Sequence, residues 1–302
     1  MKNSKICIVT GASRGLGRGI ALILAREEGC RVYATARNAD ALNELAREAT
    51  EGHEDGEVVP CVLDQCDDEA VRALVNRVRS DQPHVDLLVN SAYGGLGAIA
   101  PYFGKCFWEK PISVFDSSLN IGLRSAYVMS TLVAPMMVRN KGGLIVQISS
   151  FGGVNYLFDV GYGVGKAGLD RLTTDMAVEL KPYDVHAITL YPGAAITETT
   201  AFPGGETPVF TGRAVGALLN SATKDELAKM NGKVIQTVEL AQRYGFTDAD
   251  GKLPEGPFSS SDAAKQFREA MTKPLVQFDT QAELPDSSVS NNREMAAMFP
   301  GA

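Results

Sequence analysis

The sequence TGASRGLG at residues 10–17 sets three glycines between two apolar segments of different periodicity. The preceding residues 5–10 are mostly apolar, which is typical of a buried strand, and residues 15–28 repeat apolar side chains at helical spacing. A helix N-terminus presents unpaired N–H groups and the positive end of its dipole. We therefore predict a strand–turn–helix unit that binds a nucleotide diphosphate, with a glycine-rich turn that has no ligand as the alternative.

Strands and helices continue to alternate along the chain. Such alternation implies a parallel sheet with helices on both faces and right-handed crossovers. We expect an α/β fold with a doubly wound, Rossmann-like parallel sheet of seven strands. The expected strands are residues 5–10, 31–36, 58–63, 85–90, 144–149, 185–191 and 234–237, and the main helices are residues 15–28, 39–49, 67–79, 113–139, 162–180 and 208–220.

Two segments depart from this rhythm. Residues 92–111 are rich in glycine and aromatic side chains, and so long a loop inside a compact domain is usually functional. Residues 252–302 are polar and interrupted by prolines, with one short helix expected at residues 262–272. We expect one catalytic domain, residues 1–251, followed by a partly irregular carboxyl-terminal extension, residues 252–302.

Composition excludes several classes of function. The net charge is −7 with no long basic run, which argues against nucleic acid or an anionic membrane as the main partner. Five cysteines without a C-x-x-C pair and three scattered histidines predict reduced thiols and no metal site. No apolar signal region precedes the first strand, and no apolar stretch has the length of a membrane span. We expect a cytoplasmic protein and leave peripheral membrane attachment open.

A second motif, Y-x-x-x-K, places Tyr162 and Lys166 at the start of the helix that follows the fifth strand. Residues four positions apart lie on one face of a helix. Hydride transfer to a carbonyl needs a proton donor for the developing alkoxide. A lysine ammonium beside a tyrosine lowers the pKa of the phenol by stabilising the phenolate. This pair therefore predicts proton transfer coupled to hydride transfer from a nicotinamide cofactor.

Cofactor choice is expected at the end of the second strand, where an acidic residue would bind the ribose 2′-hydroxyl. This chain has Arg37 there, and Arg14 lies in the glycine turn, so two guanidinium groups favour NADP(H) over NAD(H). The alternative for Arg37 is a solvated surface side chain. Asp64 is either an acceptor for the adenine amino group or a plain turn residue. Asn90 is expected to tie strands together and to touch the adenosine ribose.

Further polar residues follow the later strands. Ser149 and Ser150 end the fifth strand, where a hydroxyl can hold the substrate oxygen against Tyr162 or simply cap a turn. Asn120 lies inside a predicted helix, although asparagine is a poor helix former, which suggests a task such as binding a water that relays protons to Lys166. The turn at residues 192–193, followed by Thr197, can present backbone groups to the carboxamide of the cofactor.

Over residues 4–251 these motifs, in this order, resemble those of the short-chain dehydrogenase/reductase family. The resemblance implies a catalytic tetrad of Asn120, Ser150, Tyr162 and Lys166, with Ser150 preferred to Ser149 because it is the second residue after Ile148. It also implies dimers or tetramers formed through the helices at residues 113–139 and 162–180. With the positions argued above, the expected cofactor-binding residues are Gly11, Ser13, Arg14, Gly15, Leu16, Gly17, Arg37, Asp64, Asn90, Tyr162, Lys166, Pro192, Gly193, Ile196 and Thr197.

The chain also departs from the family's pattern. The usual N-N-A-G appears as N-S-A-Y, which puts the bulky Tyr93 after the alanine, and the loop before Asn120 is longer than usual. Short stretches around residues 90–94, 107–109, 156–166 and 244–248 are similar to the group called dehydrogenase/reductase SDR family member 1.

We expect an NADP(H)-dependent oxidoreductase that reduces a hydrophobic ketone or aldehyde, such as a steroid, quinone, retinoid or xenobiotic carbonyl, or oxidises the matching alcohol. The apolar and aromatic residues of segments 92–111, 151–158 and 199–211 are the expected pocket lining. One alternative is a catalytically weak NADP(H)-binding sensor or scaffold protein, and another is a lyase or epimerase on the same fold.

Overall fold

The computed structural model describes residues 4–53, 55–200 and 204–254. Most of the predicted extension, including the helix expected at residues 262–272, lies outside the described residues. The division of the chain at residue 251 stays a prediction.

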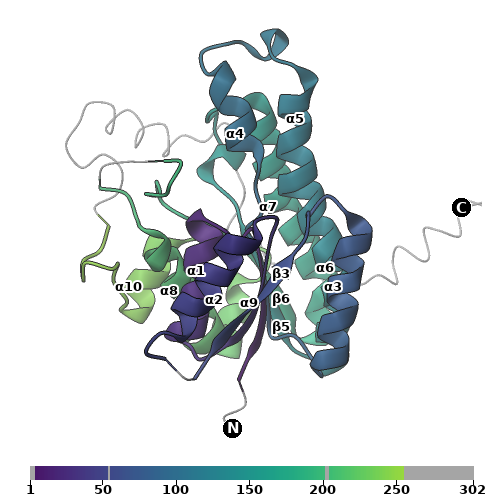
Figure 1. The fold of residues 1–302 in the computed structure, drawn as a ribbon, viewed down its shortest axis with the longest axis vertical. Helices are drawn as coiled ribbons and strands as arrows, with labels where there is room; N and C mark the ends of the chain where they lie inside the picture. Colours follow the sequence, from purple (N-terminus) through teal and green to yellow (C-terminus); the bar gives the residue numbers. More distant parts are fainter. Residues whose placement is uncertain (1–3, 54, 201–203, 255–302) are drawn as a thin grey trace, which may run out of the picture.

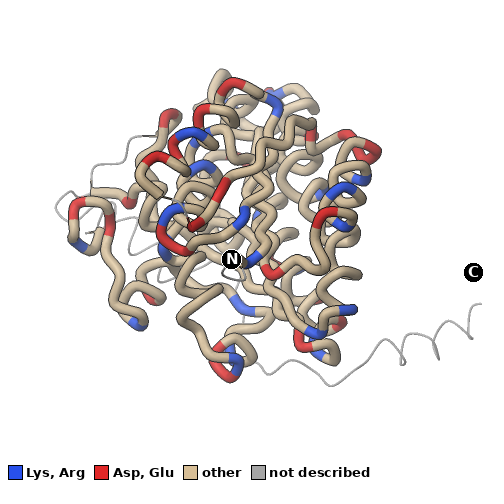
Figure 2. Tube along the Cα trace, turned by 60° about the horizontal axis from the view of Figure 1, so that its bottom comes forward, with Lys and Arg blue, Asp and Glu red and all other residues tan. Residues whose placement is uncertain are grey.

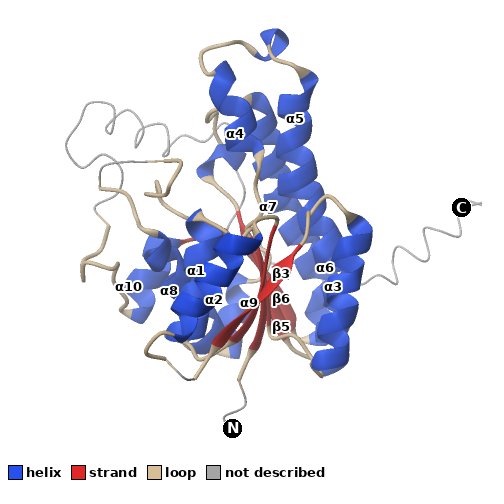
Figure 3. Cartoon of the chain, viewed as in Figure 1, coloured by secondary structure: helices blue, strands red, loops and turns tan. Residues whose placement is uncertain are grey.

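Seven parallel strands form one sheet in the order β3-β2-β1-β4-β5-β6-β7. The chain moves outward from β1 in one direction and then returns to the other side, which is the doubly wound arrangement. In Figure 3 the strands lie between helices on both sides. The predicted α/β fold is therefore confirmed. The strands are β1 (Ile6–Thr10), β2 (Arg31–Ala36), β3 (Glu57–Val62), β4 (Leu87–Asn90), β5 (Gly143–Ile148), β6 (Val185–Tyr191) and β7 (Val234–Gln236).

Helices cover both faces of this sheet (Figure 1). One apolar core joins the sheet to α1 (Gly15–Arg26), α2 (Ala39–Thr50) and α8 (Pro208–Asn220). The second core joins it to α3 (Asp68–Asp81) and to the two helices α6 (Ser125–Asn140) and α7 (Val160–Leu180). Successive side chains of β1 point to opposite faces of the sheet. Ile8 belongs to the second core and Val9 to the first. This alternation is what a strand buried on both faces requires.

Local signals set several boundaries. Asp67 caps α3, because its carboxylate accepts hydrogen bonds from the backbone N–H groups of Glu69 and Ala70 at 3.1 Å. Two short helices were not predicted, α9 (Lys224–Met230) and α10 (Thr237–Tyr244). Each carries a capping box, with Glu226 and Glu239 at the third helical position, and that pattern is readable in the sequence.

The helix predicted at residues 113–139 is continuous from Ile112 to Asn140 but has three parts. It begins as α5 (Ile112–Ser118), widens into a π-helical segment (Leu119–Arg124) and continues as α6. By length and composition alone it is the one helix among the described residues that could cross a membrane. Met129 and Val133 are completely buried against the sheet, as in the core helix of a globular domain.

The many apolar residues of this helix do not form a second, exposed face. Met129, Val133 and Met136 are buried, and Val128 and Leu132 pack against the same core. These apolar side chains are accounted for by packing against the sheet and the neighbouring helices. Other residues are exposed instead, namely Ile112, Phe115 and Tyr127 on this helix and Val160 and Val164 on α7.

Residues 92–111 are not the open loop that we expected. They contain α4 (Gly95–Ile99) and two 3₁₀ turns (Ala100–Tyr102 and Phe107–Glu109), and α4 lies beyond the carboxyl ends of the strands (Figure 1). At the end of the segment Lys110 forms a buried ion pair with Asp159, the residue that caps α7. The segment is thus fastened to the helix that carries Tyr162 and Lys166.

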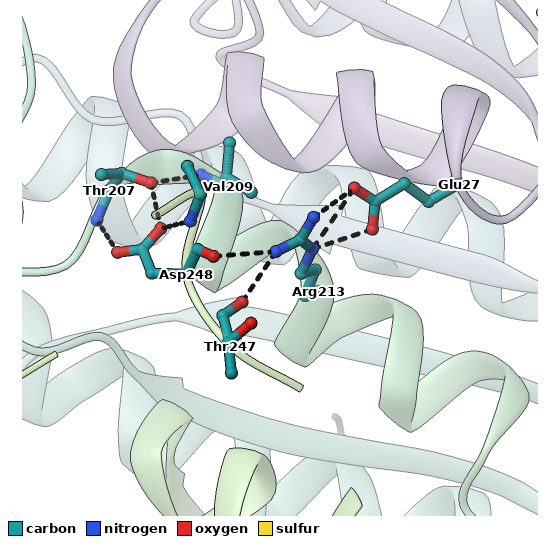
Figure 4. A network of polar contacts seen from close by, with 7 residues as sticks. Glu27, Thr207, Val209, Arg213, Thr247 and Asp248 are labelled. Atoms are coloured by element: carbon teal, nitrogen blue, oxygen red, sulfur yellow. Dashed lines mark hydrogen bonds and ion pairs between the residues drawn. The ribbon is translucent and has the colours of Figure 1, made fainter. Parts of the chain in front are cut away.

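A polar network fixes the start of α8 (Figure 4). Thr207, its capping residue, donates its backbone N–H to Asp248 at 2.8 Å and also contacts that carboxylate through its hydroxyl. Arg213 pairs with Glu27 of α1 at 2.8 Å and donates to the backbone oxygen of Thr247 at 2.9 Å. The network therefore holds the segment after α10 and the start of α8 against α1.

Charged residues of both signs are interspersed over the described surface in the view of Figure 2. Many of them pair across elements, for example Arg18 with Glu48 and Arg124 with Asp68.

Candidate active site

Tyr162 and Lys166 lie side by side near the start of α7. Asp159 caps this helix by accepting the backbone N–H of Gly161 at 2.7 Å. Both side chains are almost completely buried, and the Lys166 ammonium lies 5.8 Å from the centroid of the Tyr162 ring. Lys166 Nζ also donates to the backbone oxygen of Ile148 at 2.9 Å. The pair is therefore anchored to the carboxyl end of β5, where ligands of such sheets bind.

Burial controls the protonation of both groups. It raises the pKa of Tyr162 to about 12, against a hydrogen bond from Ser150 that lowers it. It lowers the pKa of Lys166 to about 8, against the charge of Asp170 that raises it. We expected the ammonium to lower the pKa of the phenol. The cost of burying a phenolate is instead the larger effect in this structure.

The two serines after β5 point to different partners. Ser150 caps a 3₁₀ turn (Phe151–Gly153) by accepting the backbone N–H of Gly152 at 3.2 Å, and it lies close enough to the Tyr162 phenol to lower the pKa of that phenol. The Ser149 hydroxyl donates to the backbone oxygen of Lys166 at 3.4 Å. Ser150, and not Ser149, thus lies beside the Tyr162 phenol.

Asn120 lies in the π-helical segment, which packs against α7. Its backbone oxygen accepts the N–H of Ser125, five residues on. The poor fit of asparagine to a regular helix therefore coincides with a real widening of the helix. Asn120 is exposed, and among the described residues no hydrogen bond joins its side chain to Lys166. The proposed water relay stays a prediction.

Tyr93, which falls in the segment expected to line the pocket, also contacts Tyr162 and Lys166, and we did not predict those contacts from the sequence. Its ring meets the Tyr162 ring edge-on, with centroids 5.6 Å apart, and lies 4.9 Å from the Lys166 ammonium. Its hydroxyl lies 3.1 Å from that of Ser118. At this distance an aromatic face attracts the ammonium. The bulky residue after Ala92 was the signal, because it departs from the family's glycine.

The glycine turn has the geometry of an anion cradle. Gly11 has φ +71°, and a Cβ at Gly17 would lie 2.4 Å from the backbone oxygen of Gly11, so a larger residue cannot be accommodated there. The backbone N–H of Gly15 donates to a carboxylate oxygen of Glu198 at 2.9 Å. That carboxylate stands in for a phosphate oxygen at the start of α1. The residues present therefore fit a nucleotide diphosphate.

Arg37 and Asp64 lie at the neighbouring edge, after β2 and β3. The Arg37 side chain is exposed and lies 3.8 Å from the Asp64 carboxylate. Asp64 also accepts the backbone N–H of Cys66 at 2.9 Å, which is the turn role left open above. Arg14 is exposed at the start of α1, and Ala12 ties this turn to β2 through a bond to the oxygen of Thr35. Both guanidinium groups are thus accessible to a ligand.

The role expected for the Asn90 side chain needs a correction. It donates to the hydroxyl of Ser130 on α6 at 3.0 Å and does not tie strands together. Thr10 makes that connection, because its hydroxyl accepts the N–H groups of Ser91 and Ala92. A short threonine at the end of β1 can reach the backbone after β4 directly, so the asparagine is free to hold the helix.

The loop after β6 closes the cofactor side. Gly193 donates its N–H to the buried carboxylate of Glu206 at 2.9 Å, and Ile196 donates to the backbone oxygen of the same residue. Thr197 lies beside the glycine turn, since a Cβ at Gly15 would be 3.6 Å from its methyl group. Pro192 and Ser13 are partly buried near these turns. The Leu16 side chain is partly buried and packs against the core.

The apolar lining around Tyr162 is smaller than predicted. Ile99 and Val114 are buried next to Tyr162, and Tyr93, Leu96, Tyr102, Leu157 and Phe158 pack against them. We expected Phe210 in the pocket. It is instead fully buried on α8 against Phe246, which packs on the core shared with α1 and α2. Trp108 and Phe103 are exposed, and Phe202 lies outside the described residues. Among the described residues no cluster of histidine, cysteine or acidic side chains could hold a metal ion.

Comparison with known proteins agrees with this geometry. The family model described as short chain dehydrogenase matches residues 5–203. The human protein named dehydrogenase/reductase SDR family member 1 is 41% identical over 271 residues, which cover 83% of this chain and 85% of the relative.

Solved structures show the same fold. A metagenomic short-chain oxidoreductase in complex with NADP superposes with a TM-score of 0.65 at 26% identity, covering 77% of this chain and 96% of that one. A 7α-hydroxysteroid dehydrogenase complexed with NADH and 7-oxo glycochenodeoxycholic acid gives a TM-score of 0.65 at 25% identity, covering 77% and 92%. The matched family, the relative and the site's geometry agree, and the chain belongs to the short-chain dehydrogenase/reductase family of oxidoreductases, whose fold binds a nicotinamide cofactor.

Proposed function

We propose that this protein is an NADP(H)-dependent carbonyl reductase that also oxidises the matching alcohols, with Asn120, Ser150, Tyr162 and Lys166 as its catalytic residues. The observation that carries the proposal is the buried Tyr162 phenol, which lies beside Ser150 and next to the Lys166 ammonium. Such a phenol has no evident structural partner beyond Ser150 among the described residues, and it is surrounded by apolar side chains.

The chain's own residues divide the reaction between them. When bound, the nicotinamide supplies or accepts a hydride. Ser150 holds the substrate oxygen beside Tyr162, and the Tyr162 hydroxyl donates its proton to that oxygen as negative charge develops there. Lys166 stabilises the phenolate that remains and holds the ribose hydroxyls. The aromatic ring of Tyr93 and the neighbouring apolar residues exclude water from this proton transfer.

Two exposed guanidinium groups support the preference for NADP(H). Arg14 and Arg37 follow β1 and β2, and no acidic residue ends β2. An arginine pair can bind a 2′-phosphate with charge-assisted hydrogen bonds. The weak ion pair between Arg37 and Asp64 also supports this choice, because an exposed contact of 3.8 Å costs little to break.

The lining around Tyr162 supports a hydrophobic substrate. Leu96, Tyr102, Leu157 and Phe158 present aromatic and aliphatic surface, and Ser150 with Tyr162 provides a small convergent polar pair. Pockets of this composition bind apolar molecules and orient them by a few polar contacts. The related dehydrogenase solved with 7-oxo glycochenodeoxycholic acid supports the proposal that bulky ketones are substrates. We include steroids, quinones, retinoids and xenobiotic carbonyls in this class.

NADPH oxidation by the purified protein, measured against a panel of such carbonyls, tests the proposal. We expect turnover that Tyr162→Phe removes. Tight binding of NADPH without turnover on any member of the panel would favour the sensor or scaffold alternative.

We also propose a cytoplasmic homodimer or homotetramer. The exposed Phe115 and Tyr127 on one helix, and Val160 and Val164 on α7, support association through these helices. A monomer at micromolar concentration in sedimentation experiments would contradict this assembly.

A further inference from the structure

A buried acid lies beside the proposed catalytic pair. Asp170 follows Lys166 by one helical turn on α7, as Lys166 follows Tyr162, so the three side chains share one face of the helix. Asp170 is 2% exposed. A buried carboxylate is costly unless it is paired and hydrogen-bonded, so its partners indicate what it does.

A hydrogen bond and a close backbone approach enclose this carboxyl group. The Tyr191 hydroxyl, at the end of β6, donates a short hydrogen bond to Asp170 Oδ2. The Ser149 hydroxyl, after β5, lies close enough to the group to lower its pKa. A Cβ at Gly153 would lie 2.4 Å from Asp170 Oδ2, so a glycine is needed where the backbone passes over the carboxylate. The other oxygen, Oδ1, is buried and has no hydrogen-bond partner among the described residues.

The titratable groups that face Asp170 are Lys166 and Tyr162 on its own helix and Tyr191 on β6. Burial raises the pKa of Asp170 to about 7, while the hydrogen bonds and the charge of Lys166 lower it. Burial also raises the pKa of Tyr191, and Asp170 adds to that rise, so Tyr191 remains a neutral donor. Lys166 is thus the cation whose charge the carboxylate can stabilise.

We propose that Asp170 is a positioning residue that keeps the Lys166 ammonium protonated and thereby sets the pH range in which Tyr162 and Lys166 work together. The proposal rests on the function proposed above. It gives Tyr191 a role as well, since its hydroxyl holds the carboxyl group through a hydrogen bond. Asp170 itself touches neither substrate nor cofactor in this scheme.

The direction of the effect follows from the charges. An ionised Asp170 favours the charged form of Lys166 and disfavours the phenolate of Tyr162, so it raises the pKa of both. Asp170→Asn keeps the shape and an acceptor for Tyr191 but removes the charge. Lys166 and Tyr162 should then both lose their protons at lower pH. The pH at which carbonyl reduction is lost on the basic side should fall by about one pH unit. This is the low end of the pKa shifts that a nearby charge causes.

The test compares wild type, Asp170→Asn and Thr173→Val. Thr173 is buried one turn further along α7 and hydrogen-bonds Thr189 on β6, so its variant controls for disturbed helix packing without a change of charge. One readout is the pH profile of kcat/KM for NADPH-dependent reduction. The other is independent of turnover, namely the titration of the Lys166 ¹³Cε resonance in lysine-labelled protein, assigned with Lys166→Arg.

We expect the Lys166 midpoint and the basic limb of the profile to move to lower pH in Asp170→Asn and to stay in place in Thr173→Val. An unchanged midpoint of the Lys166 ¹³Cε titration in Asp170→Asn would overturn the inference. If wild type turns over no carbonyl, the proposed function fails, and the resonance still decides the role of Asp170. If Asp170→Asn does not fold, Tyr191→Phe should give a smaller shift in the same direction, and no shift there also overturns it.

Discussion

Glu198→Gln should tighten binding of the dinucleotide. In the structure the Glu198 carboxylate accepts the N–H of Gly15 at 2.9 Å, at the start of α1 where a pyrophosphate oxygen is expected. A bound cofactor must displace this carboxylate and then lie close to its negative charge. Glutamine removes the charge and keeps the size of the side chain, so the ligand meets a weaker competitor.

The magnitude follows from two contributions. A hydrogen bond to a charged group contributes about 1.5–3 kcal/mol, and a charge at an exposed helix N-terminus about 0.3–1 kcal/mol. Both groups are exposed, and glutamine can still accept a weaker bond from Gly15. We therefore expect a gain of about 0.5–1 kcal/mol, or roughly two- to fivefold in Kd.

Fluorescence titration with NADPH at low ionic strength measures this gain, and Glu179→Gln is the control. Glu179 is exposed near the end of α7, so its variant changes the net charge equally at a distance from the glycine turn. The gain should shrink as salt is added, because exposed charges are screened. Equal affinities for wild type and Glu198→Gln, or an equal gain in Glu179→Gln, would refute the reasoning.

Three other outcomes are expected. Arg37→Asp should weaken NADPH and improve NADH, by about 1 kcal/mol for so exposed a side chain, and equal wild-type affinities for the two cofactors would sink the preference. Tyr162→Phe should lower kcat by about 10²–10⁴-fold with little change in cofactor affinity, whereas Lys166→Ala should damage both, as paired kinetics and titrations would reveal. In hydrogen exchange with cofactor and a verified substrate, residues 93–105 should gain protection while the anchored backbone at Lys110 changes little; no gain would indicate a fixed strut.

The fold could be predicted from the sequence because its signals are local. The apolar run of β1, the glycine turn and the helical spacing of α1 follow one another directly, and each is set by residues within a turn or two. Tyr162 and Lys166 are equally local, since helix geometry alone puts them on one face. Strand alternation then leaves few ways to arrange the sheet.

The electrostatics of the site depended on the tertiary structure. Gly15 and Glu198 are 183 residues apart in the chain, and only the docking of the loop after β6 brings them together. Tyr93 reaches Lys166 from the segment after β4, and Tyr191 reaches Asp170 from β6. Burial, which governs the pKa values of Tyr162 and Lys166, is a property of everything packed around them. Periodicity therefore identifies the residues that share a face, whereas only packing decides which charges those residues meet.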